Sequence, residues 1–112
     1  VQKVMYGLWG LGLMALTKII IIVDHYVDVE NTSEVAWRIG TNIDPSRDLV
    51  IVKGPADDLD HASEVPKYSG KIGIDATTKS ELDGFNRNWP DEIVMAEEIK
   101  NLVDTKWNSY KI

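Results

Sequence analysis

The stretch Lys18-Ile19-Ile20-Ile21-Ile22-Val23-Asp24-His25-Tyr26-Val27-Asp28 decides the fold of this chain. Its five consecutive β-branched residues are stiff at χ1 and favour an extended strand. Because the run is apolar without alternation, it predicts a central strand, covered on both faces, in a small mixed or parallel sheet flanked by helices. Acidic residues follow the run, and the carboxyl ends of strands are where open α/β sheets bind ligands. The sequence therefore predicts an α/β domain with its functional edge after Asp24.

Length and composition restrict the class of protein. The chain has 112 residues, 44% hydrophobic and 27% charged, which suits a single α/β domain over residues 1–112. Its net charge of -6 and the lack of a basic cluster argue against nucleic-acid binding. It has no cysteine, which excludes disulfides and a cysteine nucleophile and is typical of a cytoplasmic protein.

The apolar window from Val4 to Val23 is long enough to cross a bilayer. Lys18 lies inside it, and a charge at the centre of a span costs about 2.5–3.5 kcal/mol. Acidic rather than basic residues follow the window, so we expect no membrane span. We interpret residues 3–16 instead as a helix that is buried on nearly every side. Three glycines in this helix are expected to permit close backbone approach: Gly7, Gly10 and Gly12.

The rest of the pattern predicts alternating helices and strands. The expected elements, in chain order, are a helix that begins at Asn31 and ends at Gly40 or Asn42, a turn at 44–48, a strand at 49–52, a strand at 70–77 and a helix at about 95–107. Strand, helix and strand with short links predict a right-handed parallel crossover. The loop after the second strand would then lie at the same edge of the sheet as Asp24.

That loop, from Gly54 to Ser63, is polar and mostly acidic. Asp57, Asp58, Asp60 and His61 are residue types that bind hard cations, but their spacing does not match a calcium loop. We interpret the loop as a solvated acidic segment in which Asp60 or His61 fixes the turn. Asp24 and His25 would point to opposite faces of a strand, so no catalytic set and no metal site is predicted.

Several motifs occur together in a fixed order. They are Lys18–Asp24, Val27-Asp28-Val29, Asp44–Asp48, Leu59–Ser63, Gly70–Thr77 and Trp89-Pro90 before a terminal helix. In this combination the chain resembles the C-terminal domain of UbiD-type decarboxylases over nearly its whole length.

The resemblance implies a non-oxidative carboxy-lyase that acts on aromatic or α,β-unsaturated carboxylic acids. Enzymes of this family use prenylated FMN, a divalent metal, usually manganese, and potassium. Their catalytic residues and cofactors belong to a preceding N-terminal domain, so the resemblance places no catalytic residue in this chain. The substrate stays open among a polyprenyl 4-hydroxybenzoate of quinone biosynthesis, a simple phenolic acid and an isoprenoid-pathway acid.

The same resemblance implies that the chain is the C-terminal part of a larger, homo-oligomeric enzyme. Its expected roles are closure of the active site and contact between subunits. The residues expected to face the substrate are Pro55, Leu59, Asp60 and His61. Leu102 and Trp107 of the terminal helix are expected at the subunit interface. The alternative is a non-catalytic module for oligomerisation or regulation.

Overall fold

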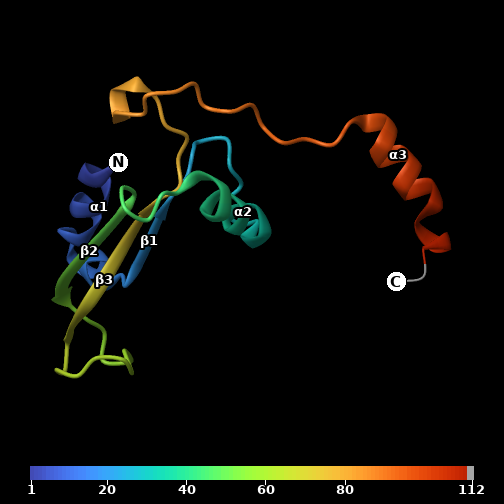
Figure 1. Ribbon diagram of the computed structural model, residues 1–112. Coiled ribbons are helices and arrows are strands. Elements are labelled where there is room, and N and C mark those ends of the chain that lie inside the picture. Colours follow the sequence, from blue (N-terminus) through green and yellow to red (C-terminus); the bar gives the residue numbers. More distant parts are fainter. Residues whose placement is uncertain (111–112) are drawn as a thin grey trace. The chain divides into compact units, whose positions relative to one another are not determined.

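Three strands form one small mixed sheet, β1 (Ile19–Ile22), β2 (Leu49–Pro55) and β3 (Tyr68–Asp75), in the order β1-β3-β2 (Figure 1). The central strand β3 pairs parallel with β1 and antiparallel with β2. This computed structural model describes residues 1–110. They fall into two units, one from Val1 to Lys79 that contains the sheet and one that begins at Ser80.

Two features of the predicted topology are wrong. The isoleucine strand β1 lies at an edge of the sheet, and β2 runs antiparallel to it instead of completing a parallel crossover. The reason is the placement of α2 (Thr32–Asn42), whose last side chain, Asn42, donates to the carbonyl of Ala76 at 2.9 Å. Because α2 ends where β1 and β3 end, the chain re-enters the sheet from that same end.

The boundaries of α2 confirm the predicted capping. The Asn31 side chain accepts a hydrogen bond from the backbone N–H of Glu34 at 3.1 Å, and the helix ends at Asn42. The turn that follows has the backbone N–H of Arg47 donating to the carbonyl of Asp44 at 2.9 Å. The next strand passes through Gly54 and Pro55, which we expected to end it; an edge strand such as β2 tolerates a proline.

The first helix is shorter than predicted. α1 (Gln2–Trp9) is followed by a separate 3-10 helix (Gly12–Leu16), and Gly12 has a φ of 47°, which ends the continuous helix. Among the described residues, no other segment lies within 4 Å of a Cβ placed on Gly7, Gly10 or Gly12. The close approach occurs at Gly73 of β3, where a Cβ would lie 2.4 Å from the Met5 sulfur. Met5 is fully buried there, so a glycine in the sheet makes room for the helix.

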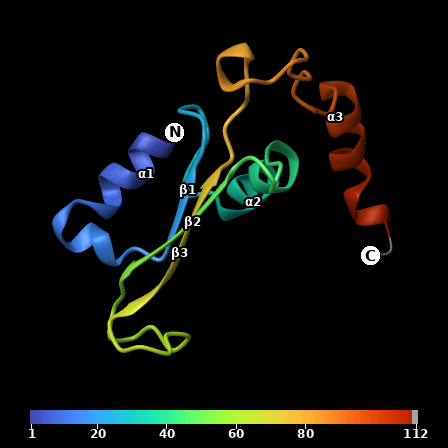
Figure 2. The same ribbon diagram turned by 60° about the vertical axis from the view of Figure 1, so that its left-hand side comes forward.

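The two faces of the sheet are covered unequally. α1 and α2 lie on opposite sides of it (Figure 2). The α1 side contains Gly73 and its partners Ile20 and Val50. The other side carries two rows of three aliphatic residues across the strands, Ile19-Ile72-Ile51 and Ile21-Ile74-Leu49. Because Ile19, Ile21 and Ile51 are exposed, the expectation that β1 is covered on both faces is wrong for the described residues.

The second unit contains α3 (Glu97–Lys106) between two short 3-10 helices, Glu81–Asp83 and Trp107–Ser109. None of the residues from 80 to 110 is buried. Exposed apolar side chains in this unit include Ile93, Val94, Ile99, Leu102 and Trp107. Among the residues that the structure describes, no helix is both long and apolar enough to cross a membrane.

Candidate functional site

Charged side chains gather at both ends of the sheet. At the carboxyl end of β1 and β3, the ammonium of Lys79 lies 3.3 Å from a carboxylate oxygen of Asp75 and 3.9 Å from one of Asp48. Lys79 also donates to the backbone carbonyl of Thr77. Arg47 completes this carboxyl-end cluster with a bond of 2.7 Å to Asp48. The side chains of Lys79 and Asp48 are almost entirely buried, so the charges depend on one another.

Burial by itself would raise the pKa of Asp48. The hydrogen bonds from Arg47 and from the backbone of Asp44, together with the charge of Lys79, outweigh it and lower this pKa below its usual value. Nearby, Asp24 accepts a hydrogen bond from the backbone N–H of Thr78 at 3.0 Å. The carboxylates of Asp24, Asp48 and Asp75 thus contact groups from other segments at this end of the sheet and help to hold the strand ends together. Whether this edge also binds a ligand stays a prediction.

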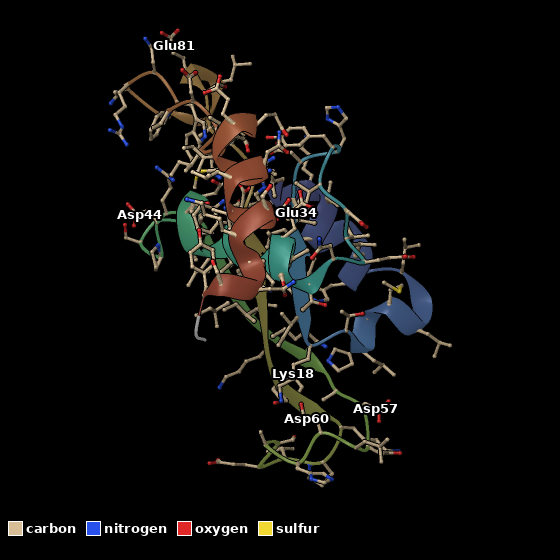
Figure 3. All side chains as sticks on the ribbon, turned by 90° about the vertical axis from the view of Figure 1, so that its right-hand side faces the viewer. Lys18, Glu34, Asp44, Asp57, Asp60 and Glu81 are labelled. Carbon is tan, nitrogen blue, oxygen red and sulfur yellow. The ribbon has the colours of Figure 1, made fainter. Side chains whose placement is uncertain are left out.

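The opposite end of the sheet has a hollow of about 510 Å³ beside the start of β1. Its lining residues are Leu16, Lys18, Asp57, Leu59, Asp60, His61 and Ala62. The antiparallel direction of β2 brings its following loop to this end, away from Asp24. The expectation that this loop and Asp24 share an edge is therefore wrong. Figure 3 shows Lys18, Asp57 and Asp60 together, well separated from Asp44.

Asp60 is the polar centre of this second site. Its carboxylate accepts hydrogen bonds from the Lys18 ammonium at 2.7 Å and from the backbone N–H of Ala62 at 3.1 Å. The pKa of Asp60 is lowered, chiefly by the bond from Lys18, with the Ala62 amide and the Ser69 hydroxyl adding to it. The predicted role of Asp60 in fixing the turn is confirmed by the Ala62 bond, and the Lys18 bond extends that role beyond the loop.

Three of the four residues predicted to face the substrate, Leu59, Asp60 and His61, line the hollow. Pro55 belongs to β2, pairs with Tyr68 and does not line it. Leu59 is 80% exposed, so its side chain is available to pack against something outside the described residues. Whether these residues face a substrate stays a prediction.

Sequence reasoning missed two lysines near the hollow. Lys18 was the only charge in the first apolar window, and that isolated charge was the available signal. Lys71, on β3, is buried, with its ammonium 3.4 Å from the carbonyl of Thr17. Burial lowers the pKa of Lys71, and the charge of Asp60 partly restores it. No sequence signal distinguished Lys71, because a lysine in an alternating strand is normally exposed.

No group of three or more histidine, aspartate or glutamate side chains among the described residues is arranged to hold a metal ion. In the hollow, Lys18 is the one lysine or arginine in the lining, and its charge is balanced by Asp60.

The fold is that of a small α/β domain with a mixed sheet, and comparison with known proteins gives its family. Residues 1–76 match the model of the C-terminal domain of 3-octaprenyl-4-hydroxybenzoate carboxy-lyase. The chain belongs to this family, the UbiD C-terminal domains. It is 45% identical over 111 residues to an uncharacterized protein of Archaeoglobus fulgidus and 47% identical over 106 residues to one of Aquifex aeolicus. These matches cover 98% and 95% of the chain but only 23% and 22% of the relatives.

Solved structures of similar fold include a decarboxylase and a UbiD-class enzyme. The vanillic acid decarboxylase of Sedimentibacter hydroxybenzoicus, in its closed form, matches 99% of this chain with a TM-score of 0.75 at 25% identity. HmfF of Pelotomaculum thermopropionicum, a UbiD-class enzyme in complex with FMN, matches 92% with a TM-score of 0.67 at 26% identity. The matched regions are 24% and 22% of those chains. The chain thus spans about a quarter of the length of these proteins.

Proposed function

We propose that this chain is the C-terminal domain of a UbiD-like, non-oxidative decarboxylase, located in the cytoplasm, that acts on an aromatic or unsaturated carboxylic acid. In the reaction, the bond to the carboxyl carbon breaks, CO₂ leaves and a proton takes its place. The preceding N-terminal domain would hold the catalytic residues, prenylated FMN, Mn²⁺ and K⁺. The observation that carries the proposal is the hollow beside Leu59, in a domain whose solved structural neighbours include vanillic acid decarboxylase.

In this proposal the loop after β2 closes over the substrate, and Leu59 forms an apolar wall of the pocket. The structure supports this role because Leu59 is held at an exposed position by polar contacts on both sides. The backbone N–H of Leu59 donates to Asp57 at 2.8 Å, and Asp60 fixes the following turn. An exposed leucine on an ordered loop suits contact with a hydrocarbon surface, such as the ring of an aromatic acid.

Replacement of Leu59 by alanine in the full-length, cofactor-loaded enzyme tests this proposal. A lost pocket wall should change relative kcat/KM between acids of different size by roughly 1–3 kcal/mol, with folding intact. Leu13→Ala is the matched control, because Leu13 is also highly exposed and lies outside the hollow. If relative activity across the acids is the same for both variants and the wild type, Leu59 does not line the site.

The terminal helix favours an additional role in homo-oligomer assembly. Ile99 and Leu102 of α3 are exposed, as is Trp107, which directly follows the helix, and Val103 of α3 is only partly covered. A helix with an apolar stripe and no covering element in its own unit gains stability by packing against a partner. Much of the surface of α1, including Val4 and Tyr6, is likewise exposed, and we expect the N-terminal domain or a partner subunit to cover it.

Leu102→Asp in the full-length protein should lower the oligomeric state measured by sedimentation, as should truncation after Asp91. Asn101→Asp is the matched control, since it introduces the same charge on the opposite face of α3. An unchanged state in the Leu102 variant would remove the helix from the interface. If the Leu102 variant loses assembly and the complete, cofactor-loaded wild type shows no decarboxylase activity, the alternative is favoured. That alternative is a non-catalytic oligomerisation or regulatory module.

A further inference from the structure

The loop that carries Leu59 is shaped by hydrogen bonds and not by packing. Asp57 accepts from the Leu59 backbone and Asp60 accepts from the Ala62 backbone, so both flanks of Leu59 are fixed within the loop. Asp57, Leu59 and Ala62 are nevertheless exposed. These local bonds determine the internal shape of the loop. The Ser63 hydroxyl, which donates to the carbonyl of Tyr68 at 2.7 Å, ties the end of the loop to the start of β3, but none of these contacts reaches β1.

One strong contact joins the loop to a distant segment. Lys18 Nζ lies 2.7 Å from Asp60 Oδ1, across 42 residues of sequence. Lys18 directly precedes β1, and its carbonyl accepts from the backbone N–H of Ile72 in β3 at 3.0 Å. The base of this contact is therefore part of the sheet. The Asp60 end is well shielded, since its side chain is only 8% exposed.

A second ion pair touches the same loop and provides an internal comparison. Lys67 lies 3.8 Å from Asp58, and both side chains are more than 70% exposed. A pair of this length and exposure contributes little, because water screens the charges and two long side chains must be ordered. The Lys18–Asp60 contact is shorter, is shielded on one side and shares its acceptor oxygen with a backbone N–H.

We infer that Lys18 is a positioning residue, which holds the loop Asp57–Ser63, and with it Leu59, against the start of β1 through Asp60. The expected effect of Lys18 on substrate choice rests on the proposed function. The expected effect of Lys18 on the order of the loop does not. Lys18 and Leu16 both line the hollow. The Lys18–Asp60 ion pair therefore also sets the distance between the start of β1 and the loop. Loss of the pair should let Leu59 move away from the place where it would meet a substrate.

Lys71 strengthens the requirement for Asp60. Burial lowers the pKa of this lysine and the charge of Asp60 raises it, so the two groups interact through space. Asp60→Asn therefore removes the ion-pair partner of Lys18 and a charge that stabilises the ammonium of Lys71. We expect it to disturb the loop more than Lys18→Met, which leaves Lys71 to balance Asp60.

Hydrogen exchange of the full-length protein tests the inference without requiring activity. Lys18→Met should speed exchange of the Leu59 and Ala62 amides by about three- to tenfold, because the loop opens more often. Lys18→Arg should retain near wild-type exchange, since it keeps a charged donor. Lys67→Met is the matched control and should change exchange by less than about twofold.

Selectivity between a small and a large acid provides the second measurement. Lys18→Met should shift the ratio of kcat/KM in the same direction as Leu59→Ala. If Lys18→Met speeds exchange but leaves selectivity unchanged, Lys18 positions the loop, and Leu59 is not a wall of the substrate pocket. If the amides of residues 57–63 exchange at the same rate in the Lys18→Met and Lys67→Met variants, Lys18 does not position the loop and the inference is overturned.

Discussion

The two ends of the sheet both pair lysine with aspartate, but they use the pair differently. At the carboxyl end of β3, Lys79 and Asp48 are buried together and are surrounded by further polar partners. At the other end, Lys18 is half exposed and its partner Asp60 belongs to a loop beside a hollow. An ion pair with both partners buried costs much free energy to separate, so it holds the strand ends together permanently. A half-exposed pair costs less to separate, so the loop that it holds can open locally.

The largest effect expected from this comparison is that of Lys79→Met. Removal of the ammonium leaves Asp75 without its lysine partner and leaves Asp48 paired with Arg47 alone. Breaking a buried ion pair costs up to about 3–5 kcal/mol. Native-state hydrogen exchange of the β3 amides in the full-length protein should show this loss. Lys67→Met, at an exposed pair, should cost less than about 1 kcal/mol. Equal losses of unfolding free energy in the two variants would show that the buried ion pairs of Lys79 do not stabilise this end of the sheet.

An intermediate effect is expected from acid. The pKa values of Asp48 and Asp60 are both lowered in the folded state, so each carboxylate stabilises the fold above its unfolded pKa of about 3.8. This contribution is present at neutral pH and is lost as the pH falls through the folded values. Protection of the β3 amides should therefore be level near neutral pH and fall below about pH 4. Asp48→Asn should be less stable at neutral pH and should show a shallower acid decline; an identical decline would contradict the assignment.

The smallest effect is expected for Lys71→Met. Burial lowers the pKa of this lysine, which means that its charged form is less favourable in the folded state than in the unfolded state. Its stabilising contribution should thus be near zero or negative, and the methionine variant should be within about 1 kcal/mol of the wild type or more stable. Exchange of the β3 amides measures this. A loss similar to that of Lys79→Met would show that both ends of the sheet rely equally on a buried ammonium.

Local order was largely predictable from the sequence. The isoleucine run, the Asn31 cap, the 44–48 turn, the alternation of Ile72 and Ile74 and the terminal helix all appear in the structure within a few residues of their expected positions. Each of these depends on side-chain stiffness, capping or periodicity, which act between residues close in the chain. Local interactions of this kind are legible in one sequence.

Part of the candidate site could also be predicted from the sequence. Leu59, Asp60 and His61 were singled out because they belong to the acidic loop after the second strand, and they line the hollow beside the start of β1. The edge assigned to that loop was wrong, because it depended on the direction of β2. A helix between two strands normally predicts a parallel crossover, but α2 stays at the end of the sheet, anchored by Asn42 to Ala76.

The sequence by itself determined the strands, the helix starts and the chemistry of the loop, since these follow from the residue types and their immediate neighbours. The tertiary structure alone decided strand order, strand direction and which charges meet. Lys18 and Asp60 are 42 residues apart, and Met5 and Gly73 are further apart still. Such contacts form only when the whole sheet has assembled, because the free energy that selects them comes from burial and pairing between distant segments.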